Sequence, residues 1–132
     1  MRTGIIGLAG AGKTTLFRIL TRGHAPQGAK HGAVHVGVAH VPDPRVARLA
    51  ELYKPKKITY ASMEYLDVAA LAGESGRDSA FLVQLREVDA LVHVVRAFED
   101  PSNPPPGGKL DPARDIETLD LDLVLYDLEQ VG

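Results

Sequence analysis

A glycine-rich segment near the start of the chain limits its fold more than any other feature. Residues 7–14 read Gly-Leu-Ala-Gly-Ala-Gly-Lys-Thr and match the whole pattern G-x-x-x-x-G-K-[ST]. Glycines allow a tight turn in which several backbone N–H groups point at phosphate oxygens, and a helix that follows presents its positive N-terminal end to the same anion. The segment therefore predicts a strand, a phosphate-binding P-loop and a helix in direct succession.

The side chains that end this motif have distinct chemical roles. Lys13 can reach the β- and γ-phosphates of a bound nucleotide, and the hydroxyl of Thr14 can ligate Mg²⁺. The other contacts are expected largely from backbone N–H groups. The residues predicted to bind nucleotide are Gly7, Ala9, Gly10, Ala11, Gly12, Lys13, Thr14 and Thr15.

The segments on either side of the loop have the patterns that a P-loop requires. Residues 3–8 form a short apolar run bounded by glycines, which is typical of a buried parallel strand. Residues 13–20 predict a helix whose buried side carries Leu16, Phe17, Ile19 and Leu20. Chance occurrence of the motif in a glycine-rich turn is the alternative, and this strand–loop–helix context argues against it.

Strand and helix patterns alternate along the rest of the chain. Further strands are predicted at 31–41, 62–68 and 90–95, and helices at 42–53 and 79–88. Met63 and Tyr65 are expected on the buried side of their strand, and the strand at 90–95, apolar on both faces, is expected to be central. Such alternation predicts an α/β fold with a largely parallel sheet.

The last quarter of the chain allows two interpretations. Residues 101–108 are rich in proline and glycine and predict a surface loop. Residues 115–131 carry apolar side chains at helical spacing, yet Leu119, Leu121 and Leu123 also alternate with aspartates as in a strand. The length of the segment favours a C-terminal helix at 115–131.

Hydrolysis would need more than the loop, because Mg²⁺ and an attacking water must also be positioned. Asp67 ends a predicted strand, where a Walker-B aspartate would lie. The sequence thus predicts Thr14 and Asp67 as metal ligands, and Lys13 and Asp67 as catalytic residues. The alternative for Asp67 is an ordinary aspartate that caps a turn. Arg86 and Arg96 could face the nucleotide, but their positions favour structural ion pairs.

Composition excludes several other classes of protein. The 132 residues fit one domain, the net charge of -2 gives no general attraction to nucleic acid or to anionic membranes, and no cysteine is present for disulfides or thiolate metal sites. No stretch approaches the roughly 20 apolar residues of a membrane helix, and no signal peptide is evident. A single domain at a cytoplasmic location, with no membrane association, is expected.

Several blocks beyond the P-loop resemble one known family. They are Val41–Arg45, Tyr53–Lys57, Met63–Ala69, the long run REVDALVHVVRAFEDP at 86–101, and Asp111–Glu117. Together with the P-loop they resemble, in order, the YchF/Obg-like ATPases, a family of translation-factor GTPases. This resemblance implies a partial Ras-like G domain over residues 1–132, truncated to about four strands, with a first switch region near 22–32.

The resemblance also implies functional assignments. Asp67 would open a D-x-x-G-like switch segment at 67–70, and Leu71 would occupy the position at which other GTPases keep a catalytic glutamine. Family members hydrolyse ATP or GTP and associate with ribosomes, so these nucleotides, Mg²⁺ and the ribosome are the implied partners. The resemblance does not decide between ATP and GTP, because the base-recognition motif of the family has no counterpart in residues 1–132.

The sequence departs from the family pattern at positions that bear on catalysis. Ala70 replaces the glycine of the switch motif, and residues 22–32 offer no threonine or serine to complete a Mg²⁺ shell. Two alternatives to an active enzyme therefore stand: a module that binds nucleotide without hydrolysing it, and a scaffold for a ribosomal or protein partner. The few strands also predict an open sheet edge that a second copy, another chain or the tail would cover.

Overall fold

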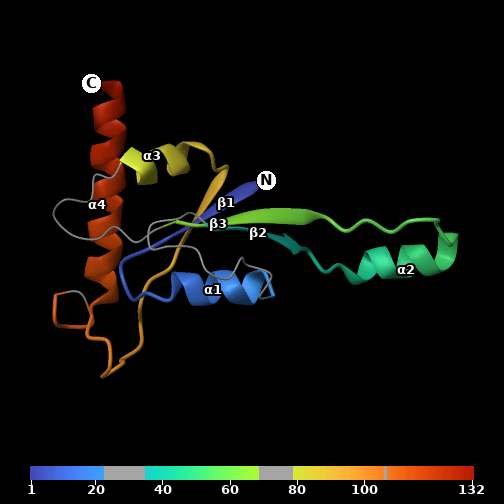
Figure 1. Cartoon of the computed structure of the whole chain (residues 1–132), viewed down its shortest axis with the longest axis horizontal. Coiled ribbons are helices and arrows are strands. Elements are labelled where there is room, and N and C mark those ends of the chain that lie inside the picture. Colours follow the sequence, from blue (N-terminus) through green and yellow to red (C-terminus); the bar gives the residue numbers. More distant parts are fainter. Residues whose placement is uncertain (23–34, 69–78, 106) are drawn as a thin grey trace.

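A computed structural model describes residues 1–22, 35–68, 79–105 and 107–132 (Figure 1). The predicted Leu71 and Ala70 and nearly all of the first switch region lie outside these described residues. The elements, in chain order, are β1 (Arg2–Ile6), α1 (Lys13–Leu20), β2 (His35–His40), α2 (Pro44–Tyr53), β3 (Ser62–Asp67), α3 (Ser79–Arg86), β4 (Ala90–His93) and α4 (Pro112–Val131).

The four strands form one mixed sheet in the order β2-β3-β1-β4. β1 is parallel to both β3 and β4, whereas β2 runs antiparallel to β3. The predicted α/β class with a mostly parallel sheet is confirmed. The expectation that residues 90–95 form a central strand is wrong for the described sheet, because β4 lies at its edge and β1 and β3 occupy the centre. An apolar strand indicates burial on both faces but not how many strands pair with it.

One face of the sheet is covered by α4, whose helical assignment is confirmed. Leu119 of α4 is fully buried against Ile6 of β1, Leu66 at the end of β3 and Val68 just beyond it. The helix begins at Pro112, earlier than predicted, because the side chain of Asp111 accepts the N–H of Arg114 and caps the first turn.

The opposite face of the sheet is covered by α1. Phe17 is fully buried there, and its ring meets that of His35 edge to face. Gly37 of β2 lies so close that an added Cβ would stand 2.4 Å from Cγ2 of Thr21. Two predictions about buried side chains are wrong.

The first concerns Ile19, which was expected on the buried side of α1. Ile19 is exposed, because it lies two residues from Phe17 and therefore on the other side of the helix.

The second correction concerns β3. Met63 and Tyr65 are only half-buried, and the deepest burial belongs to Leu66, on the face that α4 covers. Alternation along a strand separates its two faces but does not say which of them receives the longer helix.

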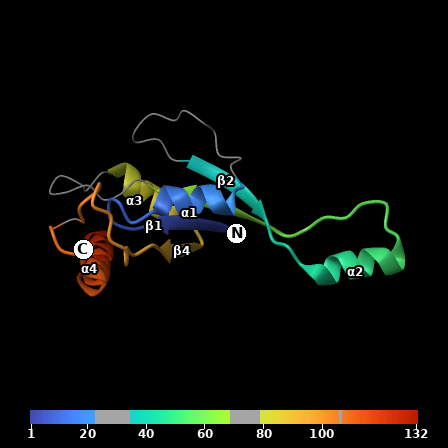
Figure 2. The ribbon, with the colours of Figure 1, turned by 90° about the horizontal axis from the view of Figure 1, so that it is seen from below.

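Residues 41–61 form an arm that projects from the sheet, with α2 at its far end (Figures 1 and 2). Asp43 caps α2 by accepting the N–H of Arg45 at 2.9 Å, Pro44 opens the helix, and Lys54 ends it in a left-handed conformation. No residue of α2 is buried. Among the described helices, none has the length and apolar content needed to cross a bilayer.

Candidate nucleotide site

The P-loop connects the centre of the sheet to α1 and is fixed by close backbone contacts. Gly7, Gly10 and Gly12 all have positive φ. At Gly7 the fit is tightest, since an added Cβ would lie 2.3 Å from the carbonyl oxygen of Val94. Glycine is therefore required at this position for two independent reasons, conformation and space.

α1 starts at Lys13, immediately after the loop. Its N-cap is Gly12, which provides no side-chain hydrogen bond, and its first turn contains no acidic residue. Residues of the first turn therefore supply no carboxylate of their own to the positive end of the helix. This arrangement suits the binding of an external anion at the loop.

Lys13 is folded back over the loop. Its Nζ donates to the carbonyl oxygen of Leu8 at 3.0 Å, and the residue is only 7% exposed. Burial lowers the pKa of the Lys13 ammonium, and the negative charge of Asp67 opposes that shift without cancelling it. The site therefore holds a partly desolvated cation, which a bound phosphate would stabilise.

Thr14 and Asp67 meet at the mouth of the loop although 53 positions separate them. The hydroxyl of Thr14 donates to Oδ2 of Asp67 at 2.8 Å. Parallel pairing makes this possible: Ile5 is opposite Asp67 in the sheet, so the end of β3 lies beside the start of the P-loop. A hydroxyl and a carboxylate oxygen at this distance from one another are hard oxygen donors of the type that Mg²⁺ prefers.

The remaining predicted contact residues have different environments. Ala11 is buried and its N–H bonds to the carbonyl oxygen of Leu8 at 3.3 Å. Ala9, Gly10 and Thr15 are exposed. Among the described residues, no group of three or more His, Cys, Asp or Glu side chains is placed to hold a metal ion. A single carboxylate beside a hydroxyl is instead the pattern that depends on nucleotide phosphates to complete the Mg²⁺ shell.

Sequence reasoning misjudged two arginines. Arg96 bonds to the carbonyl oxygens of Phe98 and Asn103, and Arg86 bonds to Tyr126 Oη and to the side-chain oxygen of Gln130. In the part of the chain that the structure describes, both guanidinium groups donate to uncharged oxygens, and neither forms the expected ion pair. Arg96 also lies against Gly10 of the P-loop, which agrees with the less favoured alternative that it faces the nucleotide site.

Comparisons with known proteins agree with this geometry. The ribosome-binding ATPase YchF of Bacillus subtilis (strain 168) is 40% identical to the chain in an alignment of 139 positions, which covers 99% of the chain and 38% of that relative. Obg-like ATPase 1 of Oryza sativa subsp. indica is 40% identical in an alignment of 139 positions, which covers 99% of the chain and 35% of that relative. Over nearly its whole length the chain is similar to a part of these YchF/Obg-like ATPases. It spans well under half the length of these curated relatives.

A solved structure leads to the same family. The YchF GTPase of Schizosaccharomyces pombe superposes with a TM-score of 0.74 at 33% identity, over 98% of this chain and 36% of that one. No family model matches the chain. The resemblance found in the sequence and the prediction of a partial P-loop G domain are both confirmed.

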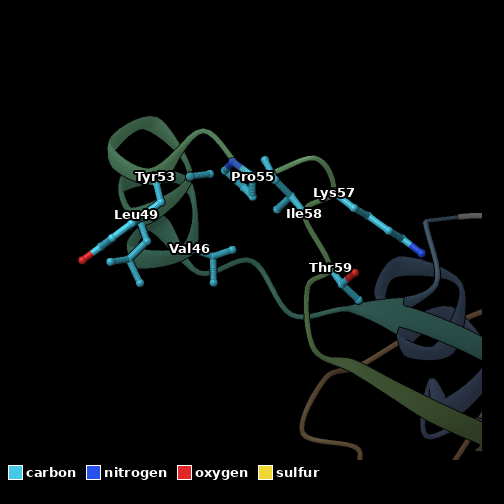
Figure 3. Close-up of a pocket in the computed structure, with 8 residues that line it drawn as sticks. Val46, Leu49, Tyr53, Pro55, Lys57, Ile58 and Thr59 are labelled. Carbon is cyan, nitrogen blue, oxygen red and sulfur yellow. The ribbon is translucent and has the colours of Figure 1, made fainter.

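A pocket of about 240 Å³ lies apart from the P-loop, in the arm (Figure 3). It is formed between α2 and the extended segment that follows, and it is lined by Val46, Leu49, Ala50, Tyr53, Pro55, Lys57, Ile58 and Thr59. Its lining is mostly apolar, and none of the predicted nucleotide or metal residues contributes to it. The pocket therefore does not belong to the candidate nucleotide site.

Proposed function

We propose that this chain binds a purine nucleoside triphosphate, GTP or ATP, together with Mg²⁺ at the P-loop. The observation that carries the proposal is the hydrogen bond of 2.8 Å between Thr14 and Asp67, beside the buried Lys13. A phosphate loop, a cation and a pair of oxygen ligands thus converge from β1, α1 and β3. The names of the relatives, which are ATPases and GTPases, support the same assignment.

Each group has a defined part in this binding. Backbone N–H groups of residues 7–15 donate hydrogen bonds to the phosphate oxygens. The proposed contact residues are Gly7, Ala9, Gly10, Ala11, Gly12, Lys13, Thr14 and Thr15. Lys13 supplies positive charge to the β- and γ-phosphates, and Thr14 and Asp67 hold the metal ion. Bound Mg²⁺ would neutralise the charge that develops on the phosphates during transfer.

The second part of the proposal is that the chain hydrolyses the bound nucleotide at a low rate. Lys13 and Asp67 act by positioning and charge stabilisation, and Leu71 is included among the catalytic positions on family resemblance alone. A module that binds without turnover is the competing candidate. It is motivated by Ala70, which stands where the family has a switch glycine.

The proposed partners are based on the names of the relatives and not on the geometry of the site. The B. subtilis protein is named ribosome-binding, which supports a proposed association of this chain with ribosomes and, with it, a cytoplasmic location. Self-association is proposed through β4, which pairs with β1 on one side only in the described sheet and leaves Leu91 partly exposed.

Fluorescent analogues of GTP and ATP test the binding proposal directly. Wild type should bind at least one of them in the presence of Mg²⁺, and Lys13→Ala should weaken this binding by about 100-fold, as loss of a buried charge-assisted contact implies. Lys57→Ala, in the exposed arm, is the matched control and should bind like wild type. Equal affinity for wild type and Lys13→Ala would refute the proposed site.

Release of inorganic phosphate tests turnover separately. Wild type with Mg²⁺ should release phosphate faster than Lys13→Ala under single-turnover conditions. If the two rates are the same while wild type binds nucleotide, the enzyme proposal fails and the binding module is favoured.

A further inference from the structure

The segment that follows β4 places a buried arginine against Gly10 of the P-loop. Arg96 is 2% exposed. A Cβ added to Gly10 would lie 3.3 Å from Nη1 of Arg96 and 3.0 Å from Nδ2 of Asn103. The guanidinium and the amide therefore pack directly on the backbone of Gly10, within the predicted contact set for nucleotide.

Arg96 is held in place by three contacts to its own segment. Nε donates to the carbonyl oxygen of Phe98 at 3.1 Å, and Nη2 donates to that of Asn103 at 2.7 Å. The guanidinium carbon also lies 4.9 Å from the centroid of the Phe98 ring, a cation–π distance. These contacts fix the orientation of the guanidinium but bring it no negative charge.

Two requirements of this guanidinium are unmet in the part of the chain that the structure describes. No carboxylate forms an ion pair with it there, and Nη1 is buried without a hydrogen-bond acceptor. Burial of a charge without a counterion is costly, and so is a buried donor without an acceptor. An anion bound nearby would compensate for both costs, and the guanidinium lies against Gly10 of the proposed anion-binding loop.

We infer that Arg96 is a positioning residue for the phosphate chain of the nucleotide, acting through Gly10. This inference rests on the proposed nucleotide binding. Its positive charge, held in a poorly solvated position beside Gly10, attracts the polyphosphate. Its guanidinium also supports the Gly10 backbone in the conformation that presents the loop amides.

A purely structural role would be different in a measurable way. If Arg96 only braced residues 96–103, its replacement would lower stability, and the remaining folded protein would bind polyphosphate as before. If its charge matters, affinity for polyphosphate should fall in folded protein and should recover in part when lysine restores the charge.

Inorganic tripolyphosphate with Mg²⁺ is the probe, because it reports on the phosphate loop without a base or ribose. Titration calorimetry on the full chain should give about tenfold weaker binding for Arg96→Gln and about threefold for Arg96→Lys, as a charge at this depth implies. Arg114→Gln is the matched control, since Arg114 donates to the carbonyl oxygen of Lys109 far along the same connection. It should bind like wild type.

The outcomes separate the inference from the proposal beneath it. Wild type that binds neither tripolyphosphate nor nucleotide refutes the proposed function. Wild type that binds, with Arg96→Gln folded and equally tight, refutes only the role of Arg96. Equal losses for the glutamine and lysine variants would also overturn the charge role. If Arg96→Gln does not fold, Arg96→Met takes its place as the neutral variant, and unchanged affinity in folded Arg96→Met overturns the inference.

Discussion

The P-loop and the arm at residues 41–61 are built in opposite ways. At the P-loop, Gly7 touches the backbone beyond β4, and Asp67 at the end of β3 bonds to the first turn of α1. In the arm, α2 has no buried residue, and Leu52 and Tyr53 are 75% and 74% exposed. The loop is fixed by segments distant in sequence, whereas α2 in the arm is capped by residues next to it in sequence.

Because of this difference, the two regions should respond separately to substitution. A change at the P-loop disturbs the packing of β1, β4 and α1 together, so it should alter the global free energy of unfolding. A change in α2 should alter local opening of the helix and leave the rest of the fold intact. Both regions carry apolar side chains, so composition alone would not distinguish them.

Gly7→Ala should produce the largest effect. The added Cβ would overlap the carbonyl oxygen of Val94 at 2.3 Å and would also be strained at positive φ. We expect a loss of about 4 kcal/mol in the free energy of unfolding, from overpacking and backbone strain together. Urea denaturation monitored by circular dichroism measures it.

The control for this substitution is Gly108→Ala. Gly108 also has positive φ, but an added Cβ would meet nothing within 4 Å. Its cost should be about 1 kcal/mol, from backbone strain alone. Similar losses at the two glycines would show that the contact with Val94 does not constrain the P-loop.

Leu119→Ala should come next in size. Leu119 is fully buried between α4 and the sheet, and its truncation should cost about 3 kcal/mol. Leu128→Ala, in the same helix but 65% exposed, should change stability by less than about 0.5 kcal/mol. Thermal unfolding of both variants checks this, and equal shifts would mean that α4 does not pack on the sheet through Leu119.

Asp43→Ala should have a smaller and strictly local effect. Loss of the bond from Asp43 to the N–H of Arg45 should reduce the stability of α2 by about 1 kcal/mol. Hydrogen exchange should accelerate at residues 44–53 while the global unfolding transition stays unchanged. A fall in the global transition as large as that of Leu119→Ala would contradict the independence of the arm.

The smallest expected effect is the pH dependence of the contribution that Lys13 makes to the free energy of unfolding. Burial lowers the pKa of Lys13 in the folded chain, so between that pKa and the ordinary lysine value the unfolded chain binds more protons. The contribution of Lys13 to stability should therefore rise with pH in this alkaline window. Unfolding of wild type and Lys13→Met from pH 7 to 10 measures it, with wild type gaining relative to the variant.

Nucleotide affinity should move in the opposite direction over the same window. Loss of the ammonium charge removes an attraction to phosphate, so affinity of wild type should fall as pH rises. An affinity that stays constant to pH 10 would show that phosphate binding does not depend on the charge of Lys13.

The parts that sequence predicted well are those with a local pattern. The P-loop is contiguous, and residues 13–20 and 115–131 carry helical spacing, so strand, loop and helix could be placed without the fold. The sequence predicted that Asp67 and Thr14 lie near each other as metal ligands, because a strand that ends in aspartate follows the P-loop. The actual distance between them depends on parallel pairing between β1 and β3, which no local pattern encodes.

The features that could not be predicted from the sequence depend on contacts between distant segments. Arg96 resembles any arginine after an apolar strand, and only the fold brings it to Gly10. Likewise, Val46, Leu49 and Leu52 have the spacing of a packed helix, yet α2 packs on no strand. Apolar spacing indicates which side of a helix can be buried, but not whether a neighbour is present.

The central position of β1 has a consequence for how the chain reaches its native state. β1 begins at Arg2, and its neighbours are β3, 62 residues later in register, and β4, 87 residues after Thr3. Contacts so far apart in sequence are slow to form, because a long loop must close first. β2 and β3 are nearer to each other and can pair earlier. Since the P-loop leaves the end of β1, phosphate binding should appear only in the last stage of folding.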